Sequence, residues 1–92
     1  MNKKITVQNG NRVRYCVLSD KEPFDKQLNE WYFGSNRSGG MGVGVYSETI
    51  EIMDVYHQEP LAVFKILSIE DTEEDVLLAW MNDKTGKTGW AD

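Results

Sequence analysis

The sequence has little of the chemistry that small enzymes and metal-binding domains use. It contains one cysteine, Cys16, and one histidine, His57, among 92 residues. A single cysteine excludes an internal disulfide and any zinc site built from several cysteines. A single histidine excludes a histidine-rich metal site, and the G-x-S-x-G nucleophile motif does not occur. The sequence therefore predicts a protein that is not an enzyme and that uses no metal or other cofactor.

Long apolar runs are also missing. Lys3 and Lys4 are followed by alternating residues at positions 5–8, whereas a signal peptide would continue with an apolar segment. No apolar stretch approaches the length of a membrane-spanning helix. A lone cysteine fits a reducing compartment. We therefore expect a cytoplasmic protein with no membrane partner.

Positive charge is scarce in the second half of the chain. Residues 1–47 contain seven Lys or Arg and four Asp or Glu, whereas residues 48–92 contain three and eleven, for a net charge of −5. This asymmetry predicts either a well-solvated surface or an electrostatic dipole with an acidic side. Direct binding of nucleic acid as the main activity is disfavoured, because neutralising phosphates requires clustered Lys and Arg. An acidic side instead suits a protein partner with a basic surface.

Residues 3–18 have the pattern of a β-hairpin. Asn9 and Gly10 form a preferred pair for the centre of a tight turn. The apolar residues that alternate with polar ones, and so predict the buried face, are Ile5, Val7, Val13, Tyr15 and Val17. Arg12, Arg14 and Cys16 would then occupy the other face of the second strand.

Residues 22–33 predict one amphipathic helix. Residues 19–22, Ser-Asp-Lys-Glu, have the form of a capping box, Pro23 fits the first turn, and Gly34 is suited to end the helix. Phe33 falls outside the apolar stripe and either points outward or packs beneath the following loop. The stripe at helical spacing consists of Phe24, Leu28, Trp31 and Tyr32.

The rest of the sequence predicts four or five antiparallel strands. The apolar residues occupy odd-numbered positions over 41–45 but even-numbered positions over 50–52. This change indicates two strands, about 41–46 and 49–57, joined by a turn or a bulge. A strand at 61–69 and a charged turn at 70–75 follow. Residues 76–81 are expected to form a strand or, less favoured, a helix. Residues 87–90 are expected to form a short last strand. The chain is therefore expected to be a single α+β domain over residues 1–92, with one helix packed on a small antiparallel sheet.

The glycine-rich stretch 34–44 does not have the spacing of a phosphate-binding loop. It matches neither G-x-G-x-x-G nor a Gly-Lys-Ser/Thr loop, and it leads from a helix into a strand, which is the wrong order. It predicts either a flexible connection or a contact loop, in which Gly42 and Gly44 let another element or a partner approach the backbone. In the second case the partner-binding residues are Phe33, Asn36, Arg37 and Ser38.

An acidic run follows the strand expected at 61–69. Its order does not fit a calcium loop, which needs D-x-D-x-D-G and a distant Glu. The run predicts either a solvated loop or a patch that binds Lys and Arg of a partner. The residues concerned are Glu70, Asp71, Glu73, Glu74 and Asp75.

By elimination, the sequence predicts a non-enzymatic binding protein. We expect a small acidic inhibitor that blocks a basic surface of a host nucleic-acid-handling or defence complex, such as a ribonucleoprotein. The short, acidic and motif-poor chain resembles phage anti-CRISPR proteins in style, and no residue motif carries that resemblance. The alternatives are an immunity protein that caps a nuclease toxin, an accessory module that assembles through an open sheet edge, and a small ribonuclease that uses His57.

Overall fold

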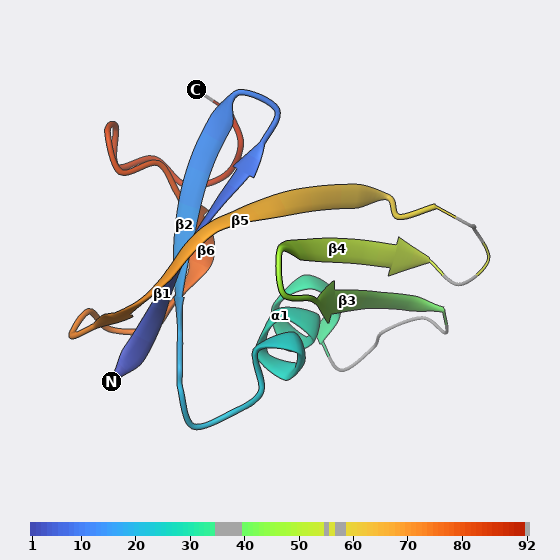
Figure 1. Cartoon of the computed structure of the whole chain (residues 1–92), viewed down its shortest axis with the longest axis horizontal. Coiled ribbons are helices and arrows are strands. Elements are labelled where there is room, and N and C mark those ends of the chain that lie inside the picture. The colour runs from blue at the N-terminus through green and yellow to red at the C-terminus, as the bar shows by residue number, and fades with distance from the viewer. Residues whose placement is uncertain (35–39, 55, 57–58, 92) are drawn as a thin grey trace.

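The computed structural model describes residues 1–34, 40–54, 56 and 59–91 (Figure 1). Its six strands form one antiparallel sheet in the order β3-β4-β5-β1-β2-β6, and the helix lies against β3. The predicted α+β fold is thus confirmed, with an N-terminal hairpin, one helix and four further strands. The elements are β1 (Asn2–Asn9), β2 (Arg12–Leu18), α1 (Phe24–Phe33), β3 (Met41–Val45), β4 (Thr49–Asp54), β5 (Ala62–Thr72) and β6 (Leu77–Met81).

Strand β5 joins the two parts of the sheet. Its first residues pair with β4, and the rest of the strand pairs with β1. The register shifts where Thr6 pairs with Ser68 but Val7 pairs with Ile66, so Leu67 is an extra residue in β5. A bulge of this kind bends a strand and increases its twist. The sheet therefore curls around its own core (Figure 1).

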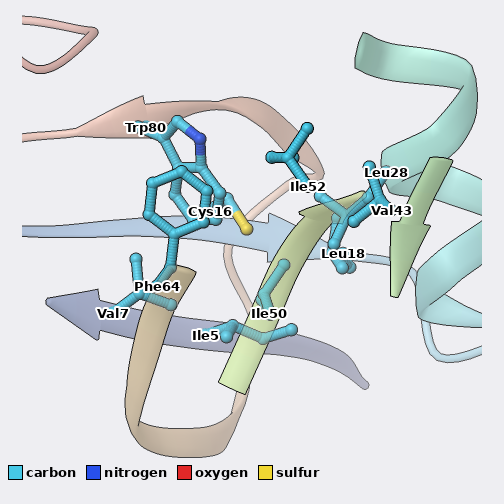
Figure 2. Packing of buried hydrophobic residues seen from close by; sticks show 10 residues of the cluster. All are labelled: Ile5, Val7, Cys16, Leu18, Leu28, Val43, Ile50, Ile52, Phe64 and Trp80. Atoms are coloured by element: carbon cyan, nitrogen blue, oxygen red, sulfur yellow. The ribbon is translucent and has the colours of Figure 1, made fainter. Parts of the chain in front are cut away.

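The core takes side chains from every strand and from the helix (Figure 2). Burying each large apolar side chain contributes about 1.5–3 kcal/mol. Half-buried aromatic side chains pack against this core. The indole N–H of Trp80 donates a hydrogen bond to the hydroxyl of one of them, Tyr32. The buried members of this hydrophobic cluster are Ile5, Val7, Cys16, Leu18, Leu28, Val43, Ile50, Ile52, Phe64 and Trp80.

The hairpin forms where predicted, but its turn and its buried face differ from the expectation. Asn9 pairs with Arg12, so the central residues of the turn are Gly10 and Asn11, and Gly10 has the positive φ of 63°. Directly paired residues share a face of the sheet. The partners of the buried Ile5 and Val7 are Cys16 and Arg14. The core face of β2 is therefore Arg14, Cys16 and Leu18. Val13, Tyr15 and Val17 lie on the outer face, where only Val17 is buried as predicted.

Helix α1 begins at Phe24, and the predicted capping box does not form. Pro23 has extended dihedral angles of −56° and 140°, and the residue before a proline is disfavoured from helical conformation, so Glu22 stays outside the helix. The side chain of Gln27 binds the backbone at this end of the helix instead. Its buried side chain accepts a hydrogen bond from the Ser19 N–H at 2.9 Å and donates to the Ser19 and Glu22 carbonyls at 2.8 and 3.0 Å. At the other end, Gly34 has the positive φ of 61° that a glycine permits.

For the strands after the helix, one prediction is confirmed and two are wrong. Residues 77–81 form strand β6, as preferred, and not a helix. Strand β5 continues through Thr72, so the first half of the predicted charged turn is a strand paired with Asn2, Lys3 and Lys4. The last predicted strand, 87–90, is reduced to a single bridge between Thr88 and Met81, because the chain turns at Gly89, whose φ is 90°.

Candidate functional site

The acidic residues of β5 and of the β5–β6 connection gather at the open end of the β1–β2 hairpin. The connection crosses this end beside the N-terminus, where the Asn2 side chain donates to the Glu74 carbonyl at 2.9 Å (Figure 1). Asp20, just after β2, also acts electrostatically on Asp71. We call this group the acidic corner; it consists of Asp20, Glu70, Asp71, Glu73, Glu74 and Asp75.

Three cations of the N-terminal segment neutralise part of the acidic corner. The amino group of Met1 lies 2.8 Å from the Asp20 carboxylate, and the Lys4 ammonium lies 3.9 Å from Glu74. The hydrogen bond between Lys3 and Asp71 raises the pKa of the lysine and lowers that of the carboxyl group. The bond from the N-terminal amine likewise lowers the pKa of Asp20. These pairs are exposed, so each contributes little to stability.

The other three carboxylates of the acidic corner form no ion pair within the described part of the chain; they belong to Glu70, Glu73 and Asp75. Apolar side chains stand exposed on either side of them in sequence. Ile69 is 46% exposed before the run, and Val76 and Leu78 are 44% and 40% exposed after it. Ile69 and Leu78 lie on β5 and β6, which β1 and β2 separate in the sheet, so the apolar side chains flank the acidic run in sequence.

The opposite end of the hairpin is basic. A shallow depression of about 240 Å³ lies beside the β1–β2 turn and is lined by Arg12, Arg14 and Lys84, with Asp83 among them. In Figure 1 this turn lies at the top, while the N-terminus and the β5–β6 connection lie at the lower left. The charge asymmetry is therefore arranged along the hairpin and not between the two halves of the sequence, since Lys3 and Lys4 sit inside the acidic corner.

The predicted contact loop is described only at its two ends. Phe33 is half-buried, packs against the core and has its ring centroid 6.1 Å from that of Tyr32, so of its two predicted orientations the inward one is found. Helix α1, which ends at Phe33, packs against the edge strand β3, whereas the acidic corner lies at the open end of the β1–β2 hairpin (Figure 1). Asn36, Arg37, Ser38 and His57 lie outside the described residues.

Contacts within the chain account for the two glycines of β3. A Cβ at Gly44 would lie 2.7 Å from the hydroxyl oxygen of Tyr46, whose ring folds back over the glycine. A Cβ at Gly42 would lie 3.4 Å from the side-chain oxygen of Asn29. The close approach that these glycines predicted is therefore made by the protein's own side chains.

Sequence reasoning missed the roles of Asn29 and Arg14. The Asn29 side chain binds the N–H and the C=O of Val43, at 2.9 and 3.0 Å. Only the position of the helix relative to strand β3 reveals this contact. Arg14 is 4% exposed and donates to the carbonyls of Gly89, Val13 and Ala91 at 2.9, 2.8 and 3.5 Å. Its place between Val13 and Tyr15 made it look like a residue of the outer face.

The described residues offer no group of three or more His, Cys, Asp or Glu side chains that could hold a metal ion. Cys16 is fully buried in the core, and burial raises the pKa of its thiol to about 12, so it is not poised as a nucleophile. No helix among the described ranges combines the length and the apolar character needed to cross a membrane.

Comparison with protein-family models, with curated proteins and with solved structures finds no match to this chain.

Proposed function

We propose that the protein is a non-enzymatic inhibitor that acts in the cytoplasm and binds a basic surface of a nucleic-acid-handling or defence complex. The observation that carries the proposal is the composition of the acidic corner. Glu70, Glu73 and Asp75 are unpaired within the described part of the chain, and exposed Ile69 and Val76 flank them in sequence. A solvated turn has no need of the apolar side chains, whereas a docking surface uses them as its contact area.

The mechanism is electrostatic and steric. Carboxylates of the acidic corner would pair with Lys and Arg side chains that otherwise hold phosphates, and Ile69 and Val76 would pack against the apolar surface between those cations. Opposite charges speed the encounter and select the partner, while the desolvated apolar contacts slow dissociation. The bound domain then covers the site where nucleic acid would lie.

The test compares two charge-matched double variants. Glu73→Gln with Asp75→Gln removes two unpaired carboxylates of the acidic corner. Glu48→Gln with Glu59→Gln removes two exposed carboxylates elsewhere and changes the net charge by the same amount. Each protein is used for affinity capture from nuclease-treated host lysate, and the recovered complex is purified and titrated at low and high salt.

We expect the acidic-corner variant to weaken binding about tenfold and to reduce its salt dependence, while the control variant binds as the wild type does. The wild-type protein should also compete with nucleic acid that is added to the purified partner. Equal binding by both variants would reject the proposal. Capture of one small nuclease toxin would favour the immunity alternative, and self-association without capture would favour the assembly alternative.

A further inference from the structure

The basic depression lies between two turns that are far apart in the sequence. One is the β1–β2 turn at residues 10–11, and the other follows β6 at residues 82–86. Residues of both turns line the depression, whose volume is about 240 Å³. This volume is below the range of about 300–1,000 Å³ that pockets for drug-sized ligands have. The basic depression therefore suits a small group and not a whole cofactor.

Hydrogen bonds close the second turn and fix its polar side chains. The Gly86 N–H donates to the Asn82 carbonyl at 2.8 Å, and the Asn82 N–H donates to the Lys87 carbonyl at 2.9 Å. The Asn82 side-chain oxygen accepts a hydrogen bond from the Lys84 N–H at 3.0 Å, as in an Asx turn. The turn is therefore held in shape before any ligand binds, which reduces the entropy lost on binding.

Three donor groups of the basic depression have no partner within the described part of the chain. They are the side-chain NH₂ groups of Asn11 and Asn82 and the ammonium group of Lys84. Because the Asn82 oxygen is bound to the Lys84 N–H, the NH₂ group is the free end of that amide. Lysine and asparagine side chains are common donors to phosphate oxygens.

The charged residues that line the basic depression are mostly cations. Arg12, Arg14 and Lys84 line it together with one anion, Asp83. Both arginines have contacts within the chain, so they supply positive charge, whereas Lys84 also supplies free N–H groups. Arg14 is 4% exposed, and its charge is fixed beside the depression. Salt screens a buried charge less than it screens an exposed one.

We propose that the basic depression binds a phosphate group, which belongs either to a nucleic acid strand or to a free nucleotide. The three free donors bind the phosphate oxygens, and the arginines stabilise the negative charge. One site of this size is too small to make nucleic-acid binding the main activity. The inference goes beyond the proposed function, because it assigns a second site at the opposite end of the hairpin from the acidic corner (Figure 1).

The test is an NMR titration of the full-length protein with inorganic phosphate, with a nucleoside 5′-monophosphate and with a short oligothymidylate. Acetate at the same ionic strength is the control anion. Lys84→Gln removes a free donor from the basic depression, and Lys21→Gln removes an exposed lysine charge elsewhere. Asp83→Asn removes a carboxylate that lines the depression, and Glu59→Gln, at another exposed position, is its control.

We expect inorganic phosphate to cause saturable chemical-shift changes at residues 11–14 and 82–86, and acetate to cause none there. Lys84→Gln should weaken phosphate binding about fivefold, whereas Lys21→Gln should leave it close to the wild-type value. Asp83→Asn should strengthen binding about threefold, because its carboxylate repels the anion, and Glu59→Gln should not. Asp83 and Lys84 are exposed turn residues, so both variants should fold.

The oligothymidylate separates the two sources of the phosphate group. If it shifts the same residues as inorganic phosphate does, the site binds the backbone of a strand. If only the two small probes shift them, the site binds a free or terminal phosphate. The proposal is rejected if phosphate causes no saturable change, if acetate binds equally well, or if Lys84→Gln and Lys21→Gln have equal effects.

These outcomes are distinguishable from a failure of the proposed function. The acidic-corner variant, Glu73→Gln with Asp75→Gln, keeps every residue that lines the basic depression. It should therefore bind phosphate at least as well as the wild type, while it loses affinity for the protein partner. A loss of phosphate binding in this variant would show that the two ends of the hairpin are not independent sites, and would overturn the proposal.

Discussion

The side-chain amide of Asn29 on α1 binds the backbone of Val43 on β3 through both of its polar ends. The same side chain also donates to the Asp25 carbonyl at 2.6 Å, one helical turn earlier. One residue therefore fixes the helix to the edge of the sheet and satisfies two backbone groups of that edge. The helix is held to the sheet by this polar contact as well as by the buried Leu28 beside it.

Asn29→Ala should lower the free energy of unfolding by about 1–3 kcal/mol, because it leaves the Val43 N–H and C=O without their partner. It should also promote association at high protein concentration, since an uncovered edge strand can pair with another copy. Urea denaturation and analytical ultracentrifugation measure the two effects. Glu30→Gln, an exposed change on the same helix, is the control and should have little effect on either. A monomeric Asn29→Ala variant of unchanged stability would contradict the role given to this contact.

Gly44→Ala should cost less than Gly10→Ala, although a Cβ at Gly44 meets Tyr46 at 2.7 Å and one at Gly10 meets nothing within 4 Å. Tyr46 is 52% exposed, so its ring can swing into solvent. Gly10 has a φ of 63°, where a side chain strains the backbone by about 1 kcal/mol. Urea denaturation ranks the variants, and the near-ultraviolet circular dichroism of Tyr46 should change in Gly44→Ala alone. The reverse order of stability would show that the Tyr46 ring is fixed in place.

Alkaline pH should destabilise the protein through Cys16. Burial raises the pKa of this thiol to about 12, while the unfolded chain loses the same proton near its ordinary value of about 8.5. The folded state therefore holds the proton over a range in which the unfolded state has lost it. Its contribution to stability is complete below about pH 8.5 and is lost as the pH rises towards 12, by up to about 1.4 kcal/mol per pH unit.

Cys16→Ala tests this pH dependence. The variant loses stability at every pH because it leaves a cavity in the core, but its stability should fall less steeply between about pH 9 and pH 10.5. Parallel pH curves for the variant and the wild type would contradict the linkage. Tyr32, whose pKa is also raised, mainly by burial, is present in both proteins, and only the smaller effect of the Cys16 charge on it is lost in the variant. A thiol reagent should modify wild-type Cys16 only when urea unfolds the chain.

Local sequence signals predicted the elements of the fold, because each depends on near neighbours. The stripe of Leu28, Trp31 and Tyr32 gave the helix, and the parity change before Ile50 gave two strands joined by a turn. Both are found, since periodicity reports which side of an element is buried. The same periodicity placed Cys16 on the outer face of its strand, which is wrong, because Cys16 pairs with Ile5 on the core face and is buried.

The errors arose where distant residues decide the outcome. Arg14 lies on the core face because the carbonyls of Gly89 and Ala91 accept its hydrogen bonds, and those residues are more than seventy positions away in the chain. Strand β5 continues through Thr72 because Asn2 and Lys3 of β1 pair with its last two residues. The charged run itself contains no sign of these distant partners. The acidic corner was predicted in composition, whereas its pairing with the N-terminal cations depends on strand order. Strand order has no local signal.

The buried Arg14 should be essential for holding the C-terminal segment over the core. Its guanidinium group donates to the Gly89 carbonyl at 2.9 Å and lies 5.7 Å from the Trp90 ring, which stacks on Phe64. Arg14→Lys keeps the charge but loses the planar fork that reaches several carbonyls at once. We expect a loss of about 1–3 kcal/mol in the free energy of unfolding, together with red-shifted tryptophan fluorescence as Trp90 becomes exposed. Arg12→Lys makes the same chemical change at an exposed site and should leave both quantities close to the wild-type values. If Arg14→Lys left the fluorescence unchanged, Trp90 would be held by ring stacking alone, and the burial of Arg14 would need another explanation.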